Sequence, residues 1–560
     1  MKKRIGSLAL ALCLMLTAFS TAFATPRQWE TRGSFLARLA QSSGEDLAGY
    51  AGSDCPFGDV AKNSGIRSAV CWAYDKWLVN GDENSEFRPD DTITRQEAAA
   101  ILGRYLDYRY TARPAGCGTG APDMHNVAPW AQSGVMACWM YGIIDTGDQP
   151  EFRPYDAVSG VEAGRWIQNA VDWQMSAVPE PEQKTFADSL VSAVNPEGNW
   201  SISPYSVRMC LAMQANGAKG DTRAELLSAL QIDDLDQFNQ AVRERLARYD
   251  DYSRIMALDT ANSIWMNQSW FDGKGTFLKE FSDAVQTYYR AEARDVTLAD
   301  SVEKVNAWVK EKTRGKIPAI LTEDNRDFTT ALVNAVYFKA AWEKEFPESR
   351  TEKGAFANQD GTTAWVDFMH QTDEFGYFST PGVEAVKLDY RKYAVDNEMG
   401  DNWEYFRDAD FSMYLILSDR DDLAVDNLLH TAAFEKAKVK LTVPKFKIEY
   451  GKAMDDALQA LGVRTAYNSD KADLSAMVDK RVLPGGRLYL DTVLHKTYLS
   501  IDEKGTEAAA VTAAMDIAAA APVDRPPLVR EFTADKPFYF AIRDNADGEL
   551  LFVGRYENAG

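Results

Sequence analysis

Side chains that commonly carry out catalysis or bind metal ions are few in this sequence of 560 residues. The histidines are His125, His370, His430 and His495. None has the short ligand spacing typical of zinc sites, and no GxxxxGK[ST] loop is present to bind a phosphate group. Cys210 lies in an apolar helical stretch without a histidine nearby, which indicates a buried residue rather than a nucleophile. The sequence gives no reason to expect a metal or another cofactor.

A segment of small residues at 503–522 is unusual for a compact domain. Alanine dominates it, so local propensity predicts a helix, and a linker is the other simple interpretation. Long loops inside compact domains are usually functional, however. A segment that slides between two strands must bury alternate residues without overpacking. The residues of one face are small throughout: Thr506, Ala508, Ala510, Thr512 and Ala514. We therefore expect an exposed loop that can enter a sheet.

Composition and charge exclude further classes of function. Hydrophobic residues make up 46% and charged residues 26%, which is ordinary for a globular protein. The chain has 61 Lys and Arg against 83 Asp and Glu, giving a net charge of −22. Binding to a nucleic-acid backbone requires concentrated positive charge, so no nucleic-acid partner is expected.

The first 24 residues have the pattern of a secretory signal peptide. Three basic residues at 2–4 precede an apolar run at 8–16, and Ala22 and Ala24 are the small residues before cleavage at Thr25. A retained membrane anchor would need about 20 apolar residues, more than this run provides. No other stretch is long and apolar enough to span a bilayer. The pattern predicts a secreted protein without a transmembrane segment.

The region that follows repeats itself. The pairs of matching segments are 57–60 with 124–127, 71–72 with 138–139, and 87–89 with 152–154, at shifts of 65 to 67 residues. A fragment at 31–35 matches only the last part of the unit. Each unit predicts two helices, the second beginning at a Thr or Ser with a Glu three residues later, which is a capping box. Such small units must stack on one another to bury their apolar faces.

Residues 27–175 resemble the S-layer homology repeat, whose pattern is FxDV…W…G…FxPxxxxTRxE. The resemblance implies a small all-α domain that holds cell-wall polysaccharide, with the Thr-Arg pair lining a groove. It makes Arg32 and Arg95 candidate ligands, and an arginine fork suits carboxylate-bearing sugars. The third unit departs from the pattern because Gly160 replaces the arginine, and the first unit lacks its front half.

Four cysteines lie in the repeat region: Cys55, Cys71, Cys117 and Cys138. Four cysteines allow three connectivities. Pairing Cys55 with Cys71 and Cys117 with Cys138 would close one loop in each unit, and disulfides suit an exported protein.

The organisation predicted is a signal peptide at 1–24, a repeat domain at 25–177, a proline-containing linker at 178–182 and a large domain at 183–560. The large domain opens with helices and becomes rich in strands towards its end. Short alternating or β-branched runs occur at 331–338, 439–443, 446–450, 538–542 and 550–553. We expect an α+β fold with large antiparallel sheets.

The large domain resembles a serpin over essentially all of residues 183–560. The matching blocks are 203–206, 217–222, 306–309 with 313–317, 332–339 with Trp342, 443–446, 503–510 and 552–555. The resemblance implies the serpin fold and a suicide substrate rather than an enzyme. A serine or cysteine protease attacks a bait bond in the exposed loop, and the loop then inserts into the central sheet and carries the acylated protease with it.

The resemblance also assigns roles to residues. The loop hinge is Glu503, Gly505, Thr506, Ala508, Ala509 and Ala510, and its small residues conform to the inhibitory pattern. Glu503 is expected to pair with Lys445 near Trp342, where insertion starts. A polar cluster that controls opening of the sheet is implied for Ser203, Ser206, Asn334 and His495. Asp516 departs from the pattern, because insertion would point its carboxylate into the sheet interior at a cost in free energy.

The bait bond is placed at Ala519–Ala520 by counting from the hinge, and at about Val523–Asp524 by counting back from residues 536–538. The intervening window contains Ala518, Ala521, Pro522 and Val523. Small residues suit a protease with a shallow primary pocket, such as an elastase-like or subtilisin-like enzyme.

Two other functions stay open at this stage. The serpin domain can be an inert part of a wall-bound structural protein, or it can be a ligand carrier. The leading hypothesis is a monomeric inhibitor of serine proteases, secreted and held at the wall of a Gram-positive-type cell.

Overall fold

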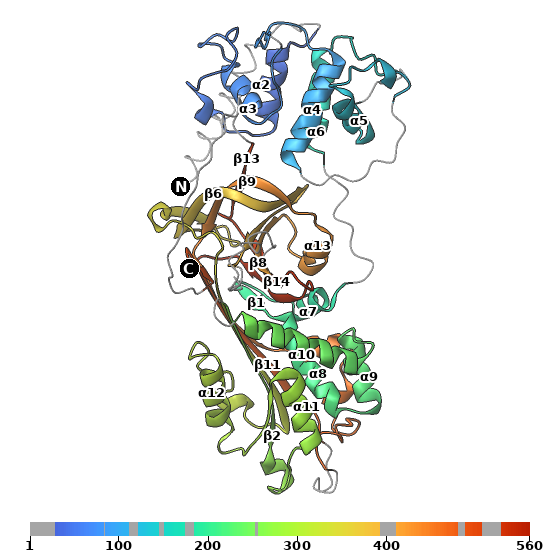
Figure 1. Ribbon diagram of the computed structural model, residues 1–560, viewed down its shortest axis with the longest axis vertical. Helices are drawn as coiled ribbons and strands as arrows, with labels where there is room; N and C mark the ends of the chain where they lie inside the picture. The colour runs from blue at the N-terminus through green and yellow to red at the C-terminus, as the bar shows by residue number, and fades with distance from the viewer. Residues whose placement is uncertain are drawn as a thin grey trace, which may run out of the picture. The chain divides into compact units, whose positions relative to one another are not determined.

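The structure is a computed structural model of the whole chain (Figure 1). It describes residues 29–82, 84–110, 121–144, 151–173, 184–252, 256–391, 410–479, 488–506 and 528–560. The predicted signal peptide and the segment from 507 to 527 lie outside these residues. The chain divides into two compact units near Val178, and each is described by itself. No helix among the described residues is both long and apolar enough to cross a membrane.

The first unit is all-α, as expected. Its helices are α2 (Arg32–Ser42), α3 (Arg67–Asp75), α4 (Arg95–Arg109), α5 (Gln132–Met140) and α6 (Gly160–Val171). Helices α2, α4 and α6 each begin at a capping box, with Thr31, Thr94 and Ser159 as the N-caps. A capping box satisfies backbone N–H groups that the first turn leaves without partners, so the same signal starts each helix.

Three short segments before these helices form a closed ring of backbone hydrogen bonds. Ile93 N donates to Glu30 O at 3.0 Å, Val158 N donates to Ile93 O at 3.0 Å, and Glu30 N donates to Val158 O at 2.8 Å. The incomplete first repeat is therefore a full member of a three-part ring. A single core fills the unit and includes Phe35, Trp72 and Trp166.

The structure corrects the alignment of the repeats. Helices α3 and α5 are related by a shift of 65 residues, from Arg67–Asp75 to Gln132–Met140, so Ala73 rather than Cys71 corresponds to Cys138. Asp59 accepts hydrogen bonds from the backbone N–H groups of residues 87 and 88, and Asp123 accepts the same bonds from residues 152 and 153. Asp123, and not Asn126, is thus the equivalent of Asp59. Insertions in the loops displaced the alignment made from the sequence.

The second unit contains two large sheets. The nine-stranded sheet has the order β1 (Trp200–Ile202), β15 (Leu550–Tyr556), β14 (Phe538–Asp544), β8 (Phe411–Ser418), β7 (Val383–Asp389), β6 (Thr363–Thr380), β9 (Glu435–Pro444) and β13 (Val529–Thr533), with β5 (Glu352–Ala357) on β6. The six-stranded sheet has the order β10 (Phe446–Ala453), β11 (Thr492–Asp502), β12 (Gly505–Thr506), β4 (Thr330–Ala341), β2 (Met256–Asn267) and β3 (Glu292–Val296). Both sheets are mixed rather than antiparallel. The pairs β4–β11, β2–β3 and β9–β13 are parallel, because long connections impose no hairpin geometry.

Helices cover both faces of the six-stranded sheet, with α12 on the side opposite α8 and α10 (Figure 1). The helices of this unit are α7 (Phe186–Val194), α8 (Pro204–Gly217), α9 (Gly220–Ala229), α10 (Leu235–Asp251), α11 (Lys279–Tyr289), α12 (Ser301–Lys312), α13 (Val425–Thr431) and α14 (Asp455–Ala460). Strand β4 is buried almost throughout, because α12 packs on one face and α8 contacts the other. This explains the nearly continuous apolar run in its sequence.

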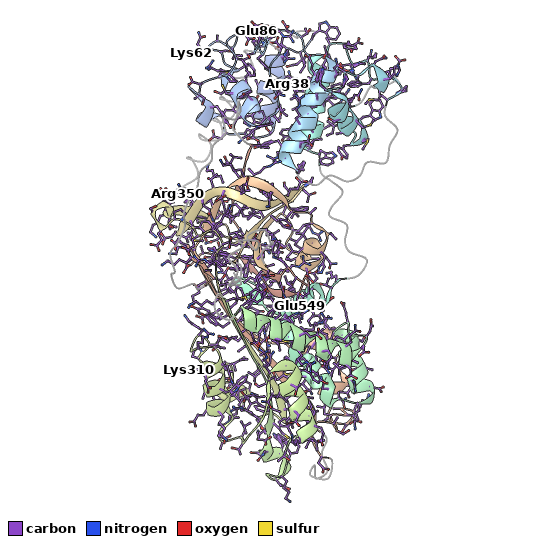
Figure 2. All side chains as sticks on the ribbon, viewed as in Figure 1. Arg38, Lys62, Glu86, Lys310, Arg350 and Glu549 are labelled. Carbon is purple, nitrogen blue, oxygen red and sulfur yellow. The ribbon has the colours of Figure 1, made fainter. Side chains whose placement is uncertain are left out.

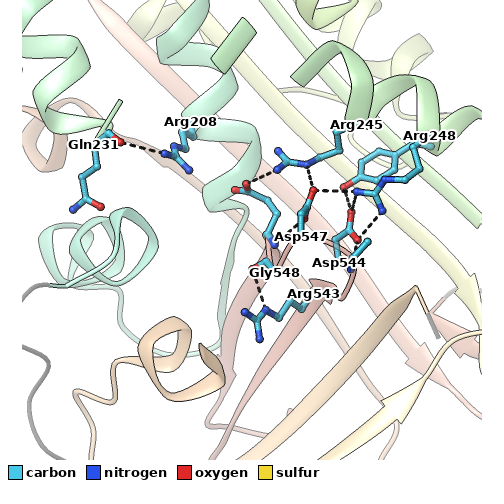
Figure 3. A network of polar contacts seen from close by, with 11 residues as sticks. Arg208, Gln231, Arg245, Arg248, Arg543, Asp544, Asp547 and Gly548 are labelled. Carbon is cyan, nitrogen blue, oxygen red and sulfur yellow. Dashed lines mark hydrogen bonds and ion pairs between the residues drawn. The ribbon is translucent and has the colours of Figure 1, made fainter. Parts of the chain in front are cut away.

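An ionic network attaches α10 to the turn between β14 and β15 (Figure 3). The Arg248 guanidinium donates to both carboxylate oxygens of Asp544, at 2.9 and 2.5 Å, and Tyr249 OH donates to the same carboxylate at 2.9 Å. Arg245 pairs with Asp547 at 2.8 Å and with the partly buried Glu549 at 3.1 Å. The carboxylate of Asp544 is fully buried, so its partners replace the water it has lost.

The variant Asp544→Asn is expected to lower the free energy of unfolding by about 2 kcal/mol, because Arg248 and Tyr249 lose a buried carboxylate partner. The matched control is Asp250→Asn, which breaks the exposed pair with Arg290 at 2.6 Å and should cost less than about 1 kcal/mol. Urea unfolding measures both. Equal effects of the two substitutions would contradict the role of burial.

Candidate functional site

The site lies where the hinge enters the six-stranded sheet. Strands β4 and β11 pair directly in parallel, from Ala331 opposite Thr492 to Tyr337 opposite Tyr498. Beyond that point the hinge strand β12 lies between them. Gly505 pairs with Asp502 on one side and Ala341 on the other, and Thr506 pairs with Ile501 and Ala340. Gly505 and Thr506 therefore lie between β4 and β11, whereas the rest of these two strands pair directly with each other.

Backbone geometry explains the glycine of the hinge. Gly505 has a φ of +150°, and a Cβ added there would lie 2.1 Å from the carbonyl oxygen of Ala340. A side chain at this position would clash with the backbone of β4. Glycine therefore allows the hinge to fit between the two strands.

Glu503 is held by two partners at the start of the hinge. Its Oε2 lies 3.0 Å from Lys445 Nζ, and its Oε1 accepts a hydrogen bond of 2.8 Å from the hydroxyl of Thr351. Partial burial opposes ionisation, but the hydrogen bonds from Thr351 and Lys445 outweigh it and lower the pKa of Glu503. The structure thus brings Glu503 and Lys445 together.

Two aromatic rings and a hydroxyl fix the inserted residues. Trp342 donates its indole N–H to Asp502 O at 3.0 Å and stacks on Tyr390, with ring centroids 4.7 Å apart and planes 12° apart. The hydroxyls of Tyr390 and Thr506 form a buried hydrogen bond of 2.6 Å. Tyr390 carries no sequence signal, because its importance comes only from its position beside the hinge.

A polar row crosses the sheet below the hinge. Asn262, Asn334 and His495 lie opposite one another on β2, β4 and β11. His495 Nδ1 contacts Asn334 Oδ1, and Asn334 Nδ2 donates to Ser206 Oγ and Asn262 Oδ1. The backbone N–H of Ser203 donates to His495 Nε2 at 3.2 Å. The four residues of the implied cluster are therefore adjacent, and Asn262 is a further member that the sequence analysis missed.

The His495–Asn334 contact joins the neighbouring strands β11 and β4. Because Nε2 accepts a hydrogen bond from Ser203, the proton of the neutral ring belongs on Nδ1, where it is donated to Asn334. Complete burial lowers the pKa of His495 from 6.5 to about 3. The ring is therefore neutral at ordinary pH and serves as a structural bridge.

The buried histidine predicts a loss of stability in acid. The unfolded chain takes up a proton at His495 below about pH 6.5, whereas the folded protein resists it down to about pH 3, so stability should fall as the pH drops through this range. The variant His495→Gln lacks the titrating ring, so the number of protons that the protein takes up on unfolding in this pH range should fall by about one. Urea midpoints measured from about pH 7 to pH 4 compare the two proteins. If the stability of the variant falls with pH as steeply as that of the wild-type protein, the role assigned to buried His495 is contradicted.

Several expected residues of the loop lie outside the described residues. They include Ala508, Ala509 and Ala510 of the hinge, Asp516, and the bait-bond window from Ala518 to Val523. Cys210 is fully buried, which raises the pKa of its thiol. No group of three or more His, Cys, Asp or Glu side chains suited to a metal ion occurs in the part of the chain that the structure describes.

In the first unit, the two candidate arginines make internal contacts. Arg32 pairs with Glu97 at 2.5 Å, and Arg95 pairs with Glu162 at 2.6 Å. The side chain of Arg95 is 1% exposed and lies over the rings of Phe152 and Trp166. Binding of wall polymer by these two residues stays a prediction.

The expected disulfide between Cys55 and Cys71 is corrected, whereas the second expected pair includes a residue that the structure does not describe. Cys55 and Cys71 are free thiols in contact with each other, and Cys138 is a buried residue whose Sγ lies 3.4 Å from Ala99 O. Burial and the contact with Cys55 raise the pKa of Cys71 to about 11, which favours the protonated thiol. Cys117 lies outside the described residues. The first proposed pair is adjacent but not bonded.

Comparison with known proteins decides the family. A family model described as serpin (serine protease inhibitor) matches residues 182–559, which is more than half of the chain. The chain belongs to the serpin family. A second family model, the S-layer homology domain, matches residues 56–99, and this domain indicates attachment to a cell surface or cell wall.

Relatives of the serpin domain include plant and animal proteins. Serpin-Z2A of Triticum aestivum is 32% identical over 67% of this chain and 95% of its own length. Leukocyte elastase inhibitor of Bos taurus is 31% identical over 64% of this chain and 93% of its own. The crystal structure of a thermophilic serpin, tengpin, in the native state matches with a TM-score of 0.57 at 28% identity, covering 67% of this chain and 92% of that one. The serpin fold expected from the sequence is confirmed.

Proposed function

We propose that this serpin is a suicide-substrate inhibitor of serine proteases, of the elastase-like or subtilisin-like type, held at the cell wall by its S-layer homology unit. The observation that carries the proposal is the position of Gly505 and Thr506 between β4 and β11, next to the part of the sheet where these two strands pair directly. The serpin domain thus has an entry point for a further strand. The small residues that follow in the sequence can bury alternate side chains in the widened sheet.

The proposed reaction begins at the bond between Ala519 and Ala520. The hydroxyl of the protease serine attacks the carbonyl carbon of Ala519, the amide bond breaks, and the amino group of Ala520 leaves with a proton. An ester then joins the protease to Ala519. Insertion of the freed loop breaks the β4–β11 ladder and replaces it with two new ladders, one on each side of the loop.

The residues around the hinge have defined parts in this process. The Glu503–Lys445 pair and the Trp342–Tyr390 stack hold the first inserted residues in register. The contact between His495 and Asn334 holds β4 and β11 together in the part of the sheet that the hinge has not entered, until insertion of the loop breaks this contact. The stored free energy is that of the additional sheet pairing, which the uncleaved loop does not obtain.

The proposal is tested by mixing the mature protein with an elastase-type serine protease. A band at the summed mass that survives denaturation, loss of protease activity, and a new N-terminus at Ala520 are expected. Complete loop cleavage with full protease activity and no adduct would refute the inhibitory function. It would instead favour the wall-bound structural protein or ligand carrier.

A charge at the second inserted position should convert the inhibitor into a substrate. Thr506 is fully buried and its hydroxyl bonds to Tyr390, so Thr506→Arg would place a cation inside the sheet. We expect cleavage at an ordinary rate with at least about tenfold less adduct, because insertion slows relative to hydrolysis of the ester. The control Thr363→Arg changes an exposed residue of β6 and should leave adduct formation intact. Equal adduct yields from the two variants would refute the insertion step.

Wall attachment has a separate test. The mature protein should sediment with isolated cell-wall sacculi of a Gram-positive-type bacterium and remain in solution when the sacculi have been stripped of their polysaccharide. Recovery of the protein only in the soluble fraction would refute attachment. Cell fractionation further tests the proposed location.

A further inference from the structure

A second row of side chains crosses the six-stranded sheet beside the hinge, on the face that α12 covers. Asp259, Tyr337, Tyr498 and Glu449 lie opposite one another on β2, β4, β11 and β10. Tyr337 and Tyr498 are the last pair of the direct β4–β11 ladder before the hinge strand comes between the two strands. Their ring centroids are 6.4 Å apart, and both residues belong to the core to which α12 contributes. Loop insertion would have to separate this pair first.

The turn that follows α12 places two cations on these rings. The guanidinium of Arg314 lies over the Tyr337 ring, with Cζ 6.0 Å from the ring centroid. The ammonium of Lys316 lies over the Tyr498 ring, with Nζ 5.3 Å from the centroid. Both distances are in the range of a cation–π attraction. A single turn therefore contacts both of the strands that insertion separates.

The turn is held in a fixed conformation. Gly315 N donates to Lys310 O at 2.7 Å (Lys310 of α12 is labelled in Figure 2), and Ile317 N donates to the buried hydroxyl of Thr313 at 3.1 Å. Arg314 and Gly315 both have a positive φ, of +53° and +79°. An arginine keeps such a backbone only where the surrounding contacts fix it. Because the turn is rigid, its two cations cannot move apart to follow two separating strands.

An ion pair determines which side of the opening the turn follows. Arg314 Nε lies 2.6 Å from Asp259 Oδ2 on β2, and β2 pairs with β4 along its length. The turn is therefore fastened to β2 and β4. Adjacent strands are about 4.8 Å apart, so a strand inserted between β4 and β11 moves them apart by that distance. The contact of 5.3 Å between Lys316 and Tyr498 would be broken by such a displacement.

Another lysine binds the same ring from the other side of the opening. Lys447 of β10 has its Nζ 4.9 Å from the Tyr498 centroid, and it pairs with Glu449 of the same strand at 2.6 Å. Because β10 pairs with β11 along its whole length, Lys447 moves together with Tyr498 when the sheet opens. The two lysines therefore make comparable contacts with one ring, but only the contact of Lys316 spans the opening.

We infer that Lys316 is a positioning residue that clamps β4 to β11 and limits the rate of loop insertion. Its ammonium joins the turn fastened to β2 and β4 to an aromatic ring on β11, at the last direct pair beside the hinge. A cation–π contact of this kind lowers the free energy of the closed sheet and is lost in the open one. The inference rests on the proposed function, because it concerns the insertion step of that mechanism.

The experiment compares Lys316→Met with Lys447→Met in the full-length mature protein. Each variant keeps the length of the side chain and removes one cation from Tyr498. The loop is cleaved by an excess of an elastase-type serine protease. The rate of insertion is followed by tryptophan fluorescence, since Trp342 lies beside the hinge, and a raised urea midpoint of the cleaved protein verifies that the loop has inserted.

Lys316→Met should insert its cleaved loop about threefold faster than the wild-type protein, because the contact across the opening is absent. Lys447→Met should insert at the wild-type rate, although it loses a contact with the same ring. Lys316→Arg keeps a cation at this position and should insert as slowly as the wild-type protein. A merely structural role of Lys316 would change the urea midpoint without changing the insertion rate.

The results separate the clamp from the proposed function. Equal rates for Lys316→Met and Lys447→Met, or a rate for Lys316→Met no higher than that of the wild-type protein, would overturn the clamp and leave inhibition in place. If cleavage of the wild-type loop changes neither the fluorescence nor the urea midpoint, the loop does not insert, and the proposed function is refuted together with the clamp. If Lys316→Met does not fold, Tyr498→Leu removes the ring instead and should also insert faster, and an unchanged rate would overturn the inference.

Discussion

The parallel pairing of β4 with β11 is the contact on which the rest of the serpin domain depends. These two strands lie at the centre of a sheet covered by helices on both faces. The hinge lies between them at one end only, where Thr506 pairs with Ala340 and Gly505 with Ala341. Their separation is opposed by backbone hydrogen bonds and by the buried bridge between His495 and Asn334. The proposed inhibition requires that these contacts hold the sheet closed and that the sheet gains pairing when a new strand enters.

The hinge is held by contacts of different physical kinds. Glu503 forms a partly exposed ion pair with Lys445, Trp342 and Tyr390 stack, and Thr506 forms a buried hydroxyl contact with Tyr390. The ion pair orients Glu503, and the stacked rings make the residues beside the hinge rigid. Because Gly505 has no side chain, the hinge backbone can approach β4 closely. The ring of the first unit follows a similar principle. Its backbone hydrogen bonds close it, and ion pairs between neighbouring units reinforce it.

Much of this could be predicted from the sequence, with identifiable gaps. The capping signals at Thr94 and Ser159 located helix starts, because they act within one turn. The positions of Glu503 and Lys445 came from resemblance, and the structure brings them into contact. Asn262 and Tyr390 were missed, since nothing in their local sequence indicates a neighbour more than seventy residues away. The disulfide between Cys55 and Cys71 was wrong, because cysteine spacing does not report whether two adjacent thiols are oxidised.

The sequence by itself determined the elements whose causes are local: the capping boxes, the buried run of β4 and the run of small residues that follows the hinge. The tertiary structure alone decided which distant groups meet. Asn334 and His495 are brought together by the pairing of strands far apart in the chain, and Glu30 and Val158 by closure of the ring. The physical reason is that a cap or a tight turn satisfies hydrogen bonds within a few residues. A strand pairing or a ring junction is fixed only when the whole fold has buried its apolar surface.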